Sequence, residues 1–423
     1  NLIVSNCTGV GPPLAEEVVR VMLLLRANSL VAGNSGVRPI IAEKLVELLN
    51  KKVHPYIPQK GSVGASGDLA PLSHMALVLL GRGQAYLDGK LLPGDVALEK
   101  TGIKPVSLKA KEGLSLCNGT QAMTSIGVLA VHDAIIISKS ADIISALTAE
   151  ALEAVPAAFD PKIHDLRPHS GQIETASNLR MLLGGNKNVS TGSSERVQDA
   201  YSLRCIPQVH GASKDAINYV KQVIEVEINA VTDNPLVFSD TKEILSGGNF
   251  HGQPVALAMD FLAIALSELA NISGLRIERM VNPSLSMGLP AFLVEKGGVN
   301  DGFMLAQYTA AALVSENKIL AHPASVDSIP TSANQEDHVS MGTTAARKCR
   351  DILENVQYVL AIEALCACQG IDLRSKNISP RLKQAYDKIR GKVSCLEEDR
   401  EMHTDFCDVV EMIKNEDFLT SLH

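Results

Sequence analysis

Long segments of helical apolar periodicity are the feature that most constrains what this chain can fold into. Apolar residues recur at helical spacing, and several of the segments exceed twenty residues, which predicts a bundle of long helices rather than a packing of short ones. Aromatic residues make up only 4% of the chain, with no Trp, and such a composition suits close helix packing better than sheets. We expect a mainly α fold with long helices over residues 120–152, 207–232, 252–279, 301–321 and 339–369.

Shorter patterns flank these segments. We expect helices over 13–32, from Pro39 to about Lys52, and over 69–80, because Gly33 suits the residue after a helix and Pro39 a first turn. Asp88-Gly89 predicts a small β hairpin over 83–92. The chain is expected to form one structural unit in three consecutive parts: an N-terminal part (1–125), a central long-helix bundle (126–370) and a C-terminal helical tail (371–423).

The charge pattern argues against two classes of partner. The net charge is −8 and the pI is about 5.8, without a basic cluster, so we expect neither a nucleic-acid partner nor an anionic membrane surface. The longest apolar stretch, 255–272, contains Asp260 and Glu268. It therefore predicts a buried helix rather than a membrane span.

The cysteines and histidines give no sign of a metal centre. Eight cysteines occur without zinc spacing or a compact disulfide framework, and the histidines show no metal-binding spacing. We expect reduced thiols, a cytoplasmic protein and no bound metal. The sequence opens at Asn1 without a Met, and we expect further residues upstream of it.

The densest local signal is the glycine-rich segment 61–72, GSVGASGDLAPL. A phosphate cradle is one interpretation, but no Lys-Ser/Thr pair follows and the G-x-G-x-x-G spacing is absent. A plain Gly-rich turn is a second. The third is chemical: the Gly67 nitrogen could attack the Ala65 carbonyl, because glycine lets the backbone bend sharply. Loss of two waters, one from Ser66, would leave an electrophilic methylidene-imidazolone.

The surrounding motifs favour the chemical interpretation. The segment 61–72 resembles the prosthetic-group loop of the aromatic amino acid ammonia-lyase and aminomutase family, and the resemblance extends over nearly the whole chain. Its other motifs are NSGVRP (34–39), KEGL (111–114), NGTQ (118–121), QDAYSLRC (198–205), TDNP (232–235), SGGNFH (246–251), SENK (315–318) and SANQEDHVSM (332–341).

The resemblance implies a fold, a cofactor and an assembly. The fold would be a fumarase/aspartase-like bundle of long helices. The cofactor would be a 4-methylidene-imidazol-5-one made from Ala65, Ser66 and Gly67, with no external cofactor. Family members are homotetramers whose active sites draw on more than one subunit. Their catalytic base is a Tyr on a loop upstream of the segment that matches Asn1, which this chain does not contain.

The resemblance also assigns roles to single residues. It implies that Arg204 grips the substrate carboxylate, to which its bidentate fork is suited, and that Tyr201 and Gln198 line the site. Asn118 would form or hold the imidazolone, and Phe250 would pack beside it. From the residues alone, a surface Arg-Asp pair with a half-buried Tyr, a turn Asn and a core Phe are the alternatives.

Glu336 bears on the substrate. By resemblance, histidine-using members carry Glu here, and Gln335 beside it is placed in the substrate site; a carboxylate can accept an imidazole N–H or stabilise imidazolium. Asn6 departs from the pattern, because most histidine-using members have His at this position. Asn still donates and accepts hydrogen bonds. We expect an amino acid substrate, L-histidine, deaminated to trans-urocanate and ammonia in the first step of histidine breakdown.

Two alternatives stay open at the level of sequence. One is a tyrosine- or phenylalanine-using ammonia-lyase or 2,3-aminomutase of the same family. The other is a catalytically silent structural homologue.

Overall fold

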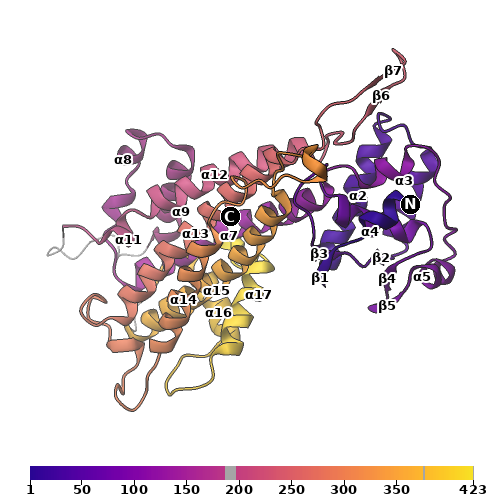
Figure 1. The fold of residues 1–423 in the computed structure, drawn as a ribbon. Coiled ribbons are helices and arrows are strands. Elements are labelled where there is room, and N and C mark those ends of the chain that lie inside the picture. Colours follow the sequence, from indigo (N-terminus) through magenta and orange to yellow (C-terminus); the bar gives the residue numbers. More distant parts are fainter. Residues whose placement is uncertain (186–196, 375–376, 423) are drawn as a thin grey trace. The chain divides into compact units, whose positions relative to one another are not determined.

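The computed structural model describes residues 1–185, 197–374 and 377–422. Most of them lie in helices, and the strands are short (Figure 1). Contacts divide the chain into two compact units: unit 1 comprises 1–130, 220–260 and 323–350, and unit 2 comprises 131–219, 261–322 and 351–423. This division follows contacts rather than chain order, so the three consecutive parts drawn on the sequence stay a prediction.

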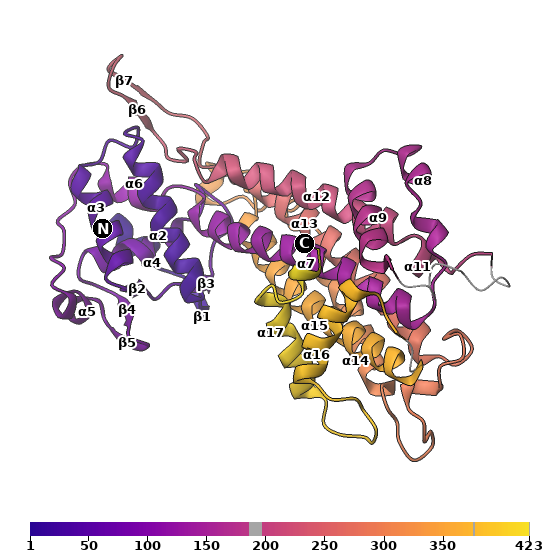
Figure 2. The same cartoon turned by 180° about the vertical axis from the view of Figure 1, so that it is seen from behind.

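Five long helices confirm the mainly α fold. Within unit 2, parts of α13, α14 and α15 run alongside one another (Figures 1 and 2). The bounds are α7 Gln121–Ala151, α12 Ile206–Glu227, α13 Gln253–Val281, α14 Met304–Leu320 and α15 Gly342–Arg374.

Several helix ends differ from the expected ones by a few residues, and two of the differences have a clear cause. Helix α12 ends at Glu227 rather than Thr232, because the chain turns so that Thr232 Oγ1 can accept a 2.8 Å hydrogen bond from Gln121 Nε2. Helix α15 begins at Gly342 rather than Val339, because the Val339 amide donates to Ser328 Oγ at 2.9 Å instead of joining a helical turn. In both places a tertiary hydrogen bond ends the helical pattern.

The remaining elements of unit 1 are short helices and short strands. Pro39 occupies the first turn of its helix, as expected, and Asp88 and Gly89 adopt positive φ of 50° and 74° at the tip of the expected hairpin. The helices are α1 Leu2–Asn6, α2 Glu16–Val31, α3 Pro39–Asn50, α4 Leu69–Leu79, α5 Gly94–Thr101 and α6 Glu112–Cys117. The strands form three small antiparallel sheets: β1 Val10–Pro13 with β3 Pro58–Lys60; β2 His54–Pro55, β4 Gln84–Leu87 and β5 Lys90–Pro93; and β6 Leu236–Phe238 with β7 Glu243–Leu245.

Shorter helices complete unit 2. Asp160 and Ser379 cap two of them, because their side chains accept hydrogen bonds from the backbone amides of Lys162 and Leu382. The helices are α8 Pro161–Asp165, α9 Ser170–Leu183, α11 Tyr201–Arg204, α16 Pro380–Lys392 and α17 His403–Lys414. Single 3₁₀ turns lie at Pro156–Phe159, Ala291–Leu293 and Leu419–Leu422 in this unit and at Ser332–Asn334 in unit 1.

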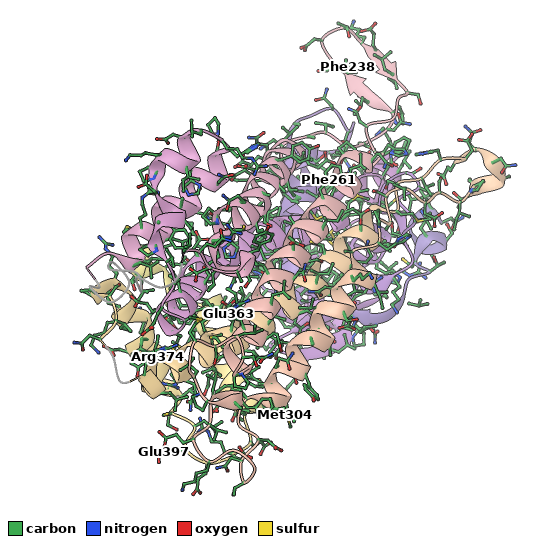
Figure 3. All side chains as sticks on the ribbon, turned by 90° about the vertical axis from the view of Figure 1, so that its left-hand side faces the viewer. Phe238, Phe261, Met304, Glu363, Arg374 and Glu397 are labelled. Carbon is green, nitrogen blue, oxygen red and sulfur yellow. The ribbon has the colours of Figure 1, made fainter. Side chains whose placement is uncertain are left out.

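Buried charges cross-link the helices of unit 2. Arg276 on α13 and Glu363 on α15 are both fully buried, and Arg276 Nη2 donates to Glu363 Oε2 at 2.9 Å (Glu363 is labelled in Figure 3). The same carboxylate accepts hydrogen bonds from Thr148 at 2.7 Å and Ser273 at 2.6 Å. A buried carboxylate with this many donors is fully compensated, so it fixes how α7, α13 and α15 meet.

Three helices, α7, α13 and α15, are long and apolar enough to cross a membrane by length and composition alone. The structure buries 72%, 67% and 83% of their most apolar windows, respectively. Packing within the chain therefore accounts for most of this apolar surface.

Candidate active site

The Ala65-Ser66-Gly67 segment forms a tight turn between β3 and α4. Ser66 and Gly67 adopt positive φ of 52° and 77°, and the Gly67 amide donates to the Gly64 carbonyl at 3.3 Å. The Gly119 amide donates to the Ser66 carbonyl at 3.2 Å. A Cβ added to Gly67 would lie 2.1 Å from the Gly119 carbonyl oxygen, so only glycine fits this position.

Asp68, directly after the turn, holds it in place through hydrogen bonds. Its carboxylate is fully buried and accepts hydrogen bonds from the Ser62 hydroxyl at 2.9 Å, from the Met123 amide at 2.8 Å and from the Thr343 hydroxyl. Burial raises its pKa above the usual value, although these three donors act in the opposite direction. Because Met123 and Thr343 lie in the first turns of α7 and α15, Asp68 fixes the turn to two long helices. Asp68 is a site residue that was not predicted from the sequence.

Asn118 is held rigidly beside the turn. Its side-chain amide donates to the Asp233 carboxylate at 3.3 Å and to the Asn234 carbonyl at 3.0 Å. Asp233 is itself buried and accepts from Lys111 Nζ at 2.7 Å. The backbone carbonyl of Asn118 accepts from Arg26 at 2.9 Å, and burial lowers the pKa of this guanidinium to about 10. The residue is thus fixed at both its backbone and its side chain.

Glu336 reaches the turn from a distant part of the sequence. The Ser66 hydroxyl donates to Glu336 Oε1 at 2.8 Å, and Thr331 Oγ1 donates to Oε2 at 3.1 Å. The carboxylate is partly buried, whereas neighbouring Gln335 is exposed. One carboxylate oxygen therefore contacts the residue from which the exocyclic carbon would be made.

A cavity of about 190 Å³ opens beside the turn. Asn6, at the end of α1, contributes to its wall, and the Asn6 side-chain amide also lies 4.0 Å from Cys117 Sγ. Phe250 is partly buried in the segment before α13. The residues that line the cavity are Ser5, Asn6, Thr8, Gly61, Ser62, Val63, Ala65, Gly67, Leu69 and Ala70.

The other three predicted site residues lie in unit 2. Arg204 Nη1 donates to Gln198 Oε1 at 2.7 Å, and the guanidinium carbon lies 4.7 Å from the centre of the Tyr201 ring. This arrangement follows from the i, i+3 spacing of Tyr201 and Arg204 on α11. Tyr201 is 70% exposed. The structure therefore brings these three residues to one another, and it places Asn6, the 65–67 turn, Asn118, Phe250, Gln335 and Glu336 in unit 1.

The family model described as aromatic amino acid lyase matches residues 1–391, which is most of the chain. The chain belongs to the aromatic amino acid lyase family. A curated relative from Alkaliphilus oremlandii, named histidine ammonia-lyase, is 60% identical over 414 residues, which are 98% of this chain and 82% of the relative.

Two solved structures resemble the chain over its full length. The crystal structure of histidine ammonia-lyase from Trypanosoma cruzi has a TM-score of 0.94 at 47% identity and is covered to 80%. The structure of tyrosine aminomutase from Streptomyces globisporus has the same TM-score at 41% identity and is covered to 84%. The fold is thus common to relatives that are named for different amino acids, so the substrate has to be argued from the site.

Proposed function

We propose that this chain is a histidine ammonia-lyase, which removes ammonia from L-histidine without oxidation and yields trans-urocanate, the opening step of histidine breakdown. The hydrogen bond between Ser66 and Glu336 carries this proposal, because it sets a carboxylate beside the electrophile-forming turn. A carboxylate can accept a hydrogen bond from an imidazole N–H. Against a phenyl ring it would lose its hydration and gain no hydrogen bond in exchange. The relatives that bear this name, at 60% and 47% identity, support the choice.

We assign the electrophile to a methylidene-imidazolone formed from Ala65, Ser66 and Gly67, with no external cofactor. The positive φ values at Ser66 and Gly67 and the absence of space for a Cβ at Gly67 fit a ring closed at this point. When present, this group supplies an electrophile that attaches the substrate covalently and so makes its amine a better leaving group. Asn118, fixed by Asp233 and Asn234, would hold the peptide in place, and Phe250 would pack beside it.

The substrate would be gripped at both ends. Glu336, with Gln335 and Asn6 nearby, would face the imidazole ring, and Arg204, with Tyr201 and Gln198, would bind the carboxylate. Arg204 Nε is buried without a hydrogen-bond partner among the described residues. A guanidinium with a spare donor can pair with a carboxylate through its planar fork. We therefore assign Arg204 to the carboxylate and Glu336 to the ring.

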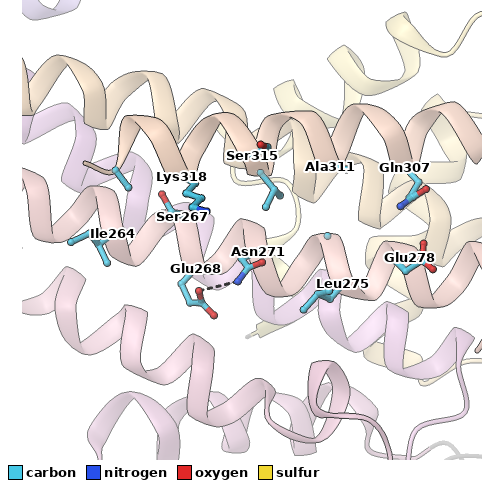
Figure 4. A pocket seen from close by; sticks show the side chains of 13 residues that line it. Ile264, Ser267, Glu268, Asn271, Leu275, Glu278, Gln307, Ala311, Ser315 and Lys318 are labelled. Carbon is cyan, nitrogen blue, oxygen red and sulfur yellow. Dashed lines mark hydrogen bonds between the residues drawn. The ribbon is translucent and has the colours of Figure 1, made fainter. Parts of the chain in front are cut away.

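We propose that this site is completed in a homotetramer with shared active sites. Arg204 and Tyr201 lie in a different unit from Ser66, and Tyr201 presents its ring to solvent. Unit 2 also has an uncovered apolar groove of about 670 Å³ between α13 and α14, with exposed Ile264 and Leu275 along it (Figure 4). Exposed apolar surface of this extent is typical of a subunit interface.

The cysteines and the net charge bear on the compartment and the binding partners of the protein. We propose a cytoplasmic protein that binds a small amino acid and neither nucleic acid nor membrane. All eight cysteines are free thiols, which suits a reducing compartment. The net charge of −8 supports the exclusion of nucleic acid.

A substrate panel tests the function. The full-length protein is offered L-histidine, L-tyrosine and L-phenylalanine, and both free ammonia and the ultraviolet absorbance of the acrylate product are followed. We expect product from L-histidine alone, and none from Ser66→Ala at unchanged tetramer mass, because the methylidene carbon comes from Ser66. Product from tyrosine or phenylalanine, or a β-amino acid without ammonia, would identify the other branch of the family. An intact-mass measurement distinguishes an active enzyme from a catalytically silent homologue. A chain that has not lost two waters at residues 65–67 has no electrophile.

A further inference from the structure

The loop that carries Glu336, residues 323–341, is attached near both its ends to the first part of α13 and the residues just before it. Near one end, the Ser325 amide donates to Asp260 Oδ2 at 2.7 Å, and the Ser325 carbonyl accepts from Gln253 Nε2 at 2.9 Å. Near the other end, His251 Nε2 lies 3.2 Å from the carbonyl oxygen of His338. His338 is two residues after Glu336, so this attachment is close to the carboxylate.

Both ring nitrogens of His251 have hydrogen-bond partners in the structure. The Gln253 amide donates to Nδ1 at 3.3 Å. Nε2 lies 3.2 Å from the His338 carbonyl oxygen and 3.4 Å from His338 Nδ1, and of these two partners only the carbonyl is always an acceptor. His251 is therefore hydrogen-bonded to the start of α13 on one side and to the Glu336 loop on the other.

The loop is stiff enough to transmit this attachment to Glu336. The Thr331 amide donates to the Glu336 carbonyl at 2.9 Å, and the Glu336 amide donates back to the Thr331 carbonyl at 3.3 Å. The Val339 amide donates to Ser328 Oγ at 2.9 Å. Beyond the loop tip, the Met341 amide donates to the Val63 carbonyl at 3.0 Å, which ties the end of the loop to the electrophile segment.

We propose that His251 is a positioning residue that holds Glu336 at the electrophile by donating from Nε2 to the backbone carbonyl of His338. This inference rests on the role proposed above for Glu336. It differs from a simple stacking contact between two rings, although the His251 and His338 rings do stack, with centroids 5.5 Å apart and planes at 27°. In a stacking role both side chains would matter equally. The bond to the backbone carbonyl, at 3.2 Å, is shorter than the 3.4 Å contact between His251 Nε2 and His338 Nδ1, so the His338 side chain should matter less than that of His251.

The test uses full-length protein with His251→Ala, His251→Gln and His338→Ala, each alone and combined with Glu336→Gln. We expect His251→Ala to lower kcat for L-histidine by about 10- to 100-fold, since a small misplacement of a catalytic group has such an effect. His251→Gln should recover most of this loss, because its amide can still donate to the carbonyl. His338→Ala removes only the longer partner at 3.4 Å and the stacked ring, so it should lower kcat clearly less than His251→Ala does.

The double variants distinguish an effect of His251 that acts through Glu336 from an unrelated loss of activity. If His251 acts through Glu336, His251→Ala should cause little further loss in the Glu336→Gln background, because the two effects are not independent. Losses that simply multiply, or a His338→Ala variant as impaired as His251→Ala, would overturn the proposal.

Amide hydrogen exchange gives a readout that does not depend on turnover. His251→Ala should speed exchange at the Glu336 and Val339 amides, and His251→Gln should not. Unchanged exchange in His251→Ala would refute the attachment even in an enzyme that acts on histidine. Conversely, a wild-type protein inactive on L-histidine would refute the proposed function, while the exchange experiment would still decide the role of His251.

Discussion

Ser66 and Glu336, 270 positions apart in the sequence, meet through a hydrogen bond of 2.8 Å between the serine hydroxyl and one carboxylate oxygen. The second carboxylate oxygen is held by Thr331 at 3.1 Å, so the carboxylate is oriented as well as placed. The serine of the 65–67 turn and the carboxylate that we assign to the substrate ring thus share one contact. The predictions below start from this pair.

Glu336→Gln should lower kcat/KM for L-histidine by about 10- to 100-fold, because a hydrogen bond to a charged group contributes about 1.5–3 kcal/mol. Glutamine keeps the shape of the side chain but carries no charge for an imidazole. The matched control is Asp337→Asn, which removes the neighbouring exposed carboxylate and should leave the kinetics unchanged. Equal kinetics for wild type and Glu336→Gln would remove Glu336 from the site.

Gly67→Ala should destabilise the protein by about 3 kcal/mol, since it combines a steric clash with a left-handed backbone. The added Cβ would lie 2.1 Å from the Gly119 carbonyl oxygen at φ of 77°. Gly89→Ala is the control, because Gly89 has φ of 74° with nothing within 4 Å of the added Cβ. It should cost only about 1 kcal/mol. Urea unfolding measures both, and similar losses would show that the clash is relieved.

Glu363→Gln should reduce the free energy of unfolding by about 3–5 kcal/mol, because it breaks a buried ion pair and leaves Arg276 without its counter-charge. Asp387→Asn serves as the comparison. It breaks an exposed pair with Lys383 on α16 and should change stability by about 0.5 kcal/mol or less. Comparable losses in the two variants would mean that water reaches the Arg276 site.

Acid should destabilise unit 2 through His210. The ring is fully buried beside Asp142, and burial lowers its pKa below the usual 6.5 despite the carboxylate. The unfolded chain therefore binds a proton that the folded chain does not. Stability should be full above about pH 6.5 and decline as the pH falls towards the folded pKa.

Thermal unfolding of His210→Gln between pH 5 and 8 checks this expectation. The variant should lose much of the pH dependence near pH 6, whereas the exposed control His132→Gln should keep the wild-type profile. An identical slope in wild type and His210→Gln would contradict the assignment.

Local pattern was enough to predict much of the fold. The long helices follow from apolar spacing, and the tip of the β4–β5 hairpin follows from Asp88-Gly89. At two helix ends that were predicted wrongly, a tertiary hydrogen bond intervenes. The Val339 amide, for example, donates to Ser328 Oγ, so α15 begins only at Gly342. Periodicity contains no information about such a partner.

In the candidate site, too, some features have a local sequence signal and others depend on distant partners. The Gly67 turn has a local signal, since only glycine tolerates its conformation. Asp68 had a weaker one, an acidic residue directly before an apolar helix, but its importance depends on Met123 and Thr343. The contact between Ser66 and Glu336 has no local signal at all, and family resemblance placed Glu336 in the substrate site without predicting this contact. The roles of Asn118, Phe250, Arg204 and the other site residues stay predictions.

The attachment of the 323–341 loop has an evolutionary consequence. The groups that hold the loop, Gln253, Asp260 and His251, belong to α13 or the residues just before it, whereas Glu336 belongs to the loop itself. A substitution of residue 336 can therefore change the side chain offered to the substrate without removing the hydrogen bonds that hold the 323–341 loop. With Glu336 in its proposed role, substrate preference can change at one codon while the scaffold is inherited intact.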